Sequence, residues 1–164
     1  MTPLTTSDLF APVADLAQGD GLEDWRWLVG RAARPLLLTA MGDVFLIKPG
    51  GILRRQSVYL LETGTGRCER VAASYEELRE LFSTSDSSTA WLLPELVASL
   101  RACGQALGEG ECYSPRRLPA LGGTFEAANF AAVNWRVHLA ITGQIHDSLK
   151  DVPDGTQVKF EVVD

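Results

Sequence analysis

The chain has 164 residues, of which 46% are hydrophobic and 22% charged, a balance that is typical of a folded globular protein and disfavours general disorder. Its net charge of −6 disfavours nucleic acid as a partner, because binding to a phosphate backbone depends on clustered Lys and Arg, and it favours a basic protein instead. The sequence has no apolar run long enough to span a bilayer and no secretory signal at its start, so we expect a cytoplasmic protein with no membrane partner.

The order of the patterns predicts an α+β fold, in which an antiparallel β-meander packs against several helices in a single compact domain. We expect a helical segment over residues 1–24, followed by an α+β domain over residues 25–164. The sheet-rich part of that domain is expected over residues 35–82, and the helical and C-terminal part over residues 88–164.

Two helices are predicted before the first strand. The first spans Thr5–Gln18. The second spans Leu22–Arg31, with Asp20 as its cap and acidic residues in its first turn. Its side chains Trp25 and Trp27 could stack on a ligand, but core packing with partial exposure is the preferred interpretation.

The pattern then changes to short β-type runs separated by glycine-containing turns. The runs lie at Leu36–Met41, Val44–Lys48, Ser57–Glu62 and Arg67–Ala72. Turn signals at this spacing predict hairpins. A phosphate-binding loop is the alternative, and it is disfavoured because no glycine turn is followed by Lys-Ser or Lys-Thr at the start of a helix.

An acidic helix is predicted to begin after Ser74, with Glu77 three residues later in the capping-box arrangement. Glu76, Glu77 and Glu80 then form an outward face. Carboxylates act as a general acid and base only when burial or close approach separates their pKa values, and an exposed face provides neither. We interpret the face as solvated surface, and these three residues as the candidate partner-binding residues.

The next stretch is predicted as a connector, a helix and a loop. Ser83–Thr89 has the composition of a linker, and Ala90–Leu107 has a helical apolar pattern. Pro94 is compatible with that helix only in its first turn. Gly108–Arg117 is predicted to be a loop.

The C-terminal stretch combines a turn, a long helix and a strand. Gly122-Gly123 predicts a chain reversal. Asn134 is the expected cap of an amphipathic helix over Trp135–Leu149, whose apolar residues recur every four positions at Val137, Ile141, Ile145 and Leu149. After a turn at residues 153–155, alternating side chains over residues 157–162 predict a closing strand.

No motif for catalysis or for a metal is present. His138 and His146 are eight residues apart on one helix, which places them about 80° apart around its axis. His138 is interpreted as a hydrogen-bonded, partly buried histidine, whereas His146, beside Asp147 near the end of the helix, is expected to have its charged form favoured by the helix dipole. Neither is interpreted as a metal ligand. Cys68, Cys103 and Cys112 form no C-x-x-C pair and are predicted to be free thiols. We therefore expect no catalytic residue, no metal and no cofactor.

Several stretches resemble one family. They are L-G-G at Leu121–Gly123, Asn129, V-x-W-x-V-H-L-A-I-T-G-Q-I-H-D-S-L-K-D-V-P-D-G-T at Val133–Thr156, G-D-V-F-L-I at Gly42–Ile47, E-T-G-T-G-R at Glu62–Arg67 and V-A-A-S-Y-E-E-L at Val71–Leu78. Together they resemble type VI secretion immunity proteins of the Tdi kind, in which a C-terminal domain follows a GAD-like region. The middle stretches also resemble the SMI1/KNR4-type (SUKH) domain, although Tyr75 stands where that pattern has Phe.

Both resemblances imply a non-enzymatic protein that binds and neutralises a toxin, which for the Tdi kind is a DNase effector. They imply a toxin as partner and leave the oligomeric state open. The alternative is a small-ligand-binding or enzymatic domain with a pocket near the C-terminal helix. In that case His138, Gln144 and Tyr113 would converge on an enclosed cavity.

Overall fold

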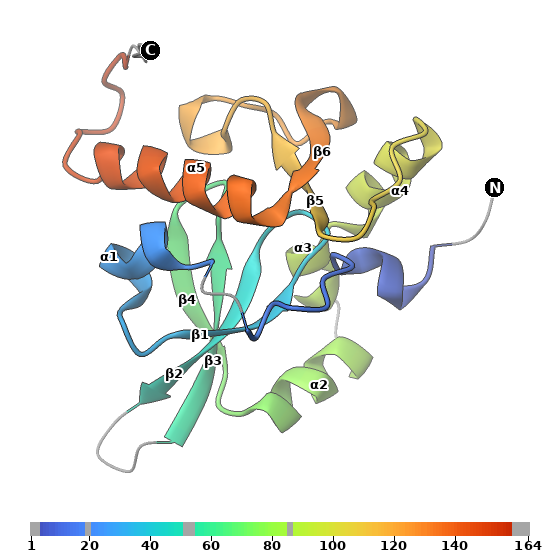
Figure 1. The fold of residues 1–164 in the computed structure, drawn as a ribbon, viewed down its shortest axis with the longest axis vertical. Helices are drawn as coiled ribbons and strands as arrows, with labels where there is room; N and C mark the ends of the chain where they lie inside the picture. The colour runs from blue at the N-terminus through green and yellow to red at the C-terminus, as the bar shows by residue number, and fades with distance from the viewer. Residues whose placement is uncertain (1–3, 19–20, 51–54, 85–86, 159–164) are drawn as a thin grey trace.

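The computed structural model describes residues 4–18, 21–50, 55–84 and 87–158, and it confirms the α+β class. Its centre is a four-stranded antiparallel sheet (Figure 1). In sheet order the strands are β1 (Arg34–Leu38), β2 (Val44–Gly50), β3 (Arg55–Glu62) and β4 (Arg67–Ala72). The predicted meander is therefore correct, with strand ends displaced by a few residues.

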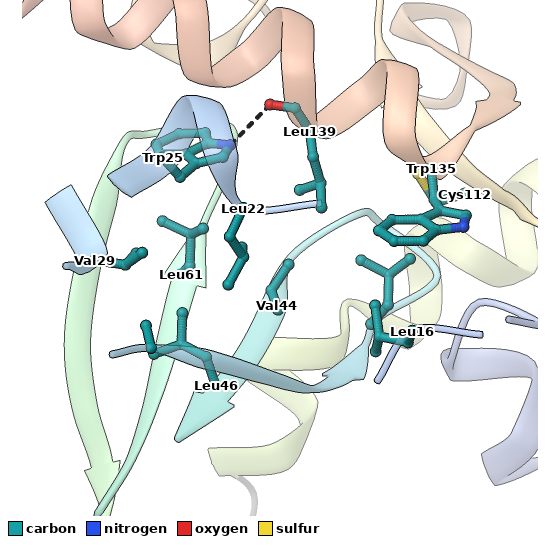
Figure 2. Close-up of a cluster of buried hydrophobic side chains, with 12 residues drawn as sticks. Leu16, Leu22, Trp25, Val29, Val44, Leu46, Leu61, Cys112, Trp135 and Leu139 are labelled. Carbon is teal, nitrogen blue, oxygen red and sulfur yellow. Dashed lines mark hydrogen bonds between the residues drawn. The ribbon is translucent and has the colours of Figure 1, made fainter. Parts of the chain in front are cut away.

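Both faces of this sheet carry buried side chains, and successive side chains of a strand point to opposite faces. On β2, Val44 and Leu46 join a cluster with Trp25, Trp135 and Leu139 beneath the C-terminal helix, as Figure 2 shows. The intervening side chain on β2 is Phe45. It packs on the other face in a second cluster, which includes residues of the helices that follow β4.

The predicted helix over Thr5–Gln18 is wrong. Only a 3-10 helix, η1 (Thr6–Leu9), forms, and Phe10 then makes an antiparallel bridge with Thr39 next to β1. Pro12 explains the difference, because a proline disfavours the helical conformation in the residue before it. The backbone N–H of Ala11 instead donates to the carbonyl of Leu38 at 3.0 Å.

The second predicted helix is present as two short pieces, η2 (Glu23–Trp25) and α1 (Arg26–Val29). Its expected cap, Asp20, lies outside the described residues. The indole N–H of Trp25 is buried and donates to the carbonyl of Leu139 at 2.9 Å (Figure 2), whereas Trp27 is 38% exposed. Core packing with partial exposure is therefore the correct interpretation of the two tryptophans.

Three helices follow the sheet: α2 (Tyr75–Thr84), α3 (Ser87–Leu92) and α4 (Pro94–Ala102). The predicted connector over Ser83–Thr89 is thus wrong, because both of its ends are helical. The predicted helix over Ala90–Leu107 is divided at Leu93, which has φ 46°. Pro94 is the first residue of α4, as expected, and the helix ends before Gly104, which has φ 81°.

The predicted loop over Gly108–Arg117 is also wrong, because its middle five residues form a strand. β5 (Glu111–Pro115) pairs antiparallel with β6 (Phe130–Asn134) in a separate two-stranded sheet. Between them lie the 3-10 helices η3 (Pro119–Leu121) and η4 (Ala127–Asn129). The predicted turn at Gly122-Gly123 is confirmed: Gly122 has φ 83°, and a Cβ on Gly123 would lie 1.9 Å from the carbonyl oxygen of Arg117.

The C-terminal helix α5 spans Trp135–Leu149, as predicted. Its cap is also as predicted, because the Asn134 side chain accepts from the backbone N–H of Arg136 at 3.0 Å. The closing strand expected over residues 157–162 is not formed at residues 157 and 158, and residues 159–162 lie outside the described residues.

The side of α5 that faces the core is not the side that carries the apolar repeat. Val137 and Ile141 are 49% and 52% exposed, whereas His138 and His146, on a neighbouring side of the helix, are buried together with Trp135 and Leu139. The difference has a physical reason, because the buried polar side chains of α5 find hydrogen-bond partners in the turns of the sheet.

Substitutions at two turn glycines distinguish the cost of backbone strain from the cost of a clash with a histidine side chain. Gly42 and Gly104 have similar φ angles, 83° and 81°, but a Cβ on Gly42 would lie 2.3 Å from Nε2 of His138, and one on Gly104 would meet nothing within 4 Å. We expect Gly104→Ala to lower the free energy of unfolding by about 1 kcal/mol. Gly42→Ala should lower it by about 1–3 kcal/mol more, since His138 is held in place. Urea unfolding measures both, and equal losses would contradict the contact.

Candidate partner-binding site

The three candidate glutamates lie together on α2 and are exposed. The backbone N–H of Glu77 donates to the hydroxyl of Ser74 at 3.1 Å, and the Glu77 carboxylate accepts from the backbone N–H of Ala73. The predicted cap is therefore present, although the carboxylate reaches one residue further back than in the usual capping box. Glu77 thus has a structural contact at the start of the helix, in addition to any contact with a partner.

A chain of buried polar side chains joins α5 to the turns of the sheet. Nδ1 of His138 lies 2.8 Å from the hydroxyl of Ser114 on β5, and its Nε2 lies 2.9 Å from the hydroxyl of Thr63, which follows β3. The Thr63 hydroxyl donates to Oδ1 of Asp43 at 3.0 Å, and the Thr63 backbone N–H donates to the same oxygen at 2.8 Å.

The direction of each hydrogen bond to His138 follows from the hydrogen that the Thr63 hydroxyl donates to Asp43. Because the Thr63 hydroxyl donates its hydrogen to Asp43, it accepts from Nε2–H of His138, and Nδ1 of His138 accepts from the hydroxyl of Ser114. Burial lowers the pKa of His138 to about 4, so the ring is neutral at pH 7. The chain of bonds is complete without an added ligand.

The second histidine of α5 is held at the same turn. Nε2 of His146 donates to the backbone carbonyl of Thr63 at 3.0 Å, and its ring centre lies 5.4 Å from that of Trp25. Burial lowers the pKa of His146, and backbone hydrogen bonds oppose that change. The interpretation of His138 as a hydrogen-bonded histidine is confirmed. The expectation that the helix dipole favours the charged form of His146 is wrong, because burial disfavours that form. In the described part of the chain no group of three His, Cys, Asp or Glu side chains is placed to hold a metal.

The polar pocket of the alternative hypothesis is not assembled. The hydroxyl of Tyr113 donates to the backbone carbonyl of Gln105 at 2.6 Å, and Nε2 of Gln144 donates to Oδ1 of Asp24 at 3.1 Å. His138 bonds to neither of them, because both of its nitrogens are taken by other partners. The expected convergence of the three side chains on one cavity is therefore wrong.

Two cavities that share Leu93 and Phe125 as lining residues form what we call the acidic groove, with volumes of about 310 and 620 Å3. Asp43 and Glu62 line the smaller cavity, together with Thr63, Thr65, Trp91 and Phe130; Glu95 and Glu126 line the larger one. Among the described residues that line either cavity, none is basic.

Asp43 is the most perturbed carboxyl group of this groove. Burial raises its pKa to about 7, the hydrogen bonds from Thr63 oppose the rise, and the charge of Glu62 adds to it. At neutral pH the protonated and the ionised form of this carboxyl group are therefore both populated. Sequence reasoning placed Asp43 only in a turn, and no local motif distinguishes it from other Gly-Asp turns.

A third cavity, of about 790 Å3, has the opposite charge. Arg116 and Arg117 line it together with the apolar residues Leu118, Leu121, Ile141 and Ile145. Part of the apolar repeat of α5 thus faces this cavity and not the core. The acidic groove and this third cavity therefore differ in the sign of the charged side chains that line them.

Residues 72–146 match the family described as T6SS immunity protein Tdi1, C-terminal. The match runs from the end of β4 through α2, the β5–β6 hairpin and most of α5. It supports a type VI immunity protein and confirms the resemblance to the Tdi kind found in the sequence. No curated protein matches the chain. In the described residues, no helix has the length and apolar character that crossing a membrane requires.

Asn in place of Asp43 should change how stability depends on pH. The folded pKa of Asp43, about 7, exceeds its ordinary 3.8, so the wild type loses stability as pH rises from 4 to 7, by at most about 4 kcal/mol. His138 acts oppositely, because its folded pKa of about 4 lies below 6.5 and stability is gained as pH rises between these values. Asp43→Asn removes only the first effect.

We therefore expect the stability of Asp43→Asn, relative to wild type, to increase steadily from pH 4.5 to pH 8 in urea unfolding. The control is Glu69→Gln, because Glu69 is an exposed carboxylate on β4. If the difference in the free energy of unfolding between Asp43→Asn and wild type does not vary with pH, Asp43 has an ordinary pKa in the folded protein.

Proposed function

Starting from the match of residues 72–146 to the C-terminal part of T6SS immunity protein Tdi1, we propose that this chain is an immunity protein that binds a cognate toxin and neutralises it. Neutralisation takes place in the cytoplasm, by formation of a stoichiometric complex and not by catalysis. The match is the observation that carries the proposal. The hydrogen bonding of His138 and His146 agrees with it, since both side chains serve the packing of α5.

The proposed toxin is a secreted nuclease, and its substrate groove is basic. A nuclease binds the phosphate backbone through Lys and Arg, so a surface rich in carboxylates competes for the same groups. The net charge of −6 of the immunity protein accelerates the encounter with such a toxin. Inhibition then follows from occlusion of the groove by the bound protein.

The acidic face of α2 is the proposed contact surface, formed by Glu76, Glu77 and Glu80. All three side chains are exposed, and Arg79 is the one basic residue of this helix. Glu76 and Glu80 are one helical turn apart, which places two like charges on the same side of α2. Two neighbouring carboxylates of this kind suit a partner with clustered positive charge.

Co-expression with the toxin encoded in the neighbouring reading frame tests the function. We expect the chain to restore growth of cells that make the toxin, and the two proteins to elute from a sizing column as one stoichiometric complex. Toxin with a disabled active site, expressed in parallel, gives the growth rate without poisoning. Continued killing at full expression, with no complex on the column, would overturn the proposal.

Charge reversal on α2 tests the contact surface. We expect Glu76→Lys and Glu80→Lys each to weaken binding to the toxin about tenfold, through lost charge pairing and new repulsion. Glu80→Lys removes a like-charge pair within α2 and does not weaken the helix, whereas Glu76→Lys also removes an acidic residue from its first turn. Circular dichroism therefore checks the helicity of both variants. Glu69→Lys on β4 is the matched control, and isothermal titration calorimetry measures all three. An equal effect of the three changes would argue against α2 as the contact surface.

A further inference from the structure

We propose that the acidic groove is an anchor pocket for an arginine side chain of the toxin, which inserts between Phe125 and the carboxyl groups of Asp43 and Glu62. The inference rests on the proposed function and adds a contact that is separate from α2. Its chemistry comes from three features of the groove: carboxylates without a basic neighbour in the lining, aromatic walls and a strained wall residue.

The charge of the groove selects a cation. Four carboxylates and no Lys or Arg are found among its described lining residues. Asp43 loses solvation in the smaller cavity, which is why its pKa is about 7. A bound guanidinium would replace the lost solvation, because an opposite charge nearby favours the ionised carboxylate. Asp43 thus lowers the stability of the isolated protein at neutral pH. When a cation binds, the same carboxylate contributes to the affinity.

The walls of the groove suit arginine better than a small metal ion. Phe125 is 54% exposed, lines both cavities and lies 6.4 Å from the ring of Phe130. Trp91 lines the smaller cavity as well. A planar guanidinium stacks on aromatic rings and makes paired hydrogen bonds to carboxylates, which an ammonium group does not. A volume of about 310 Å3 is at the small end for ligand pockets and accommodates one long side chain.

Two further features point to binding at this place. Leu93 lines both cavities and, among the described residues, is the only one other than glycine with positive φ, at 46°. Such strain in a large side chain is costly and concentrates at binding sites. The buried hydroxyl of Thr65, which lines the smaller cavity, has no hydrogen-bond partner among the described residues. An N–H group of a bound guanidinium supplies the donor that this hydroxyl lacks.

The proposal is tested by calorimetry with the toxin of the neighbouring reading frame. We expect Asp43→Asn and Phe125→Ala each to weaken binding at least tenfold at pH 8. Misfolding does not explain such a loss in Asp43→Asn, which we expect to be more stable than wild type at this pH. Val137→Ala is the matched control for Phe125→Ala, because Val137 is an apolar side chain that is 49% exposed and lies on α5 outside the groove.

The affinity of wild type should also depend on pH. A cation binds the ionised form of Asp43, so a pKa of about 7 predicts a fall in affinity of about tenfold from pH 8 to pH 6. Three other titratable groups face Asp43. They are Glu62, whose charge raises the pKa of Asp43; His138, which stays neutral because its pKa is about 4; and Cys112, whose pKa burial raises far above this pH range. Any pH dependence of the affinity that remains in Asp43→Asn comes from titration of the toxin itself, because this variant has no Asp43 carboxyl group.

A probe without the toxin separates this inference from the proposed function. We expect N-acetyl-arginine methylamide to shift the NMR signals of Thr63, Thr65 and Phe125 in wild type and not in Asp43→Asn. If wild type neutralises the toxin and both groove variants do so equally well, the pocket is wrong and the proposed function stands. If wild type binds the arginine probe but not the toxin, the proposed function is wrong. A stronger response to the matching lysine amide would overturn the preference for arginine.

Discussion

The fold depends on the hydrogen bonds that two histidines of α5 make at the turn after β3. His138 and His146 both bond to Thr63, through its hydroxyl and its carbonyl. These bonds fix the rotation of α5 about its axis, since the helix cannot turn without leaving buried polar groups unpaired. The turn glycines follow from the same constraint, because a Cβ on Gly42 or Gly66 would lie 2.3 or 2.5 Å from a ring nitrogen.

The same turn connects the packing of α5 to the proposed arginine pocket. Thr63 bonds to His138 in the core and to Asp43, and both Thr63 and Asp43 line the smaller cavity of the acidic groove. Asp43 is therefore held rigidly on Oδ1 by two donors of Thr63. A carboxyl group positioned in this way needs little reorganisation when a cation arrives, and such preorganisation raises affinity.

The rotation of α5 also explains the two kinds of hollow on the surface. With Leu139 and the two histidines towards the sheet, the helix presents Val137 and Ile141 outwards, and Ile141 lines the cavity that contains Arg116 and Arg117. The acidic groove lies elsewhere, around Leu93 and Phe125. The linings of this cavity and of the acidic groove thus carry charges of opposite sign. This difference favours the acidic groove over the cavity with Arg116 and Arg117 as a contact for a basic partner.

The sequence by itself determined the elements whose signals are local: the glycine-punctuated meander, Pro94 at the start of a helix and α5 with its Asn134 cap. Each of these depends on residues within a few positions of one another. Only the tertiary structure decided which side of α5 is buried, because His138 is stable in the core only when Ser114 and Thr63 bind it. Local sequence patterns likewise did not predict the pairing of β5 with β6 or the acidic groove. The residues that form each of them are distant in sequence, so the strands pair and the carboxyl group of Asp43 is buried only when the chain folds.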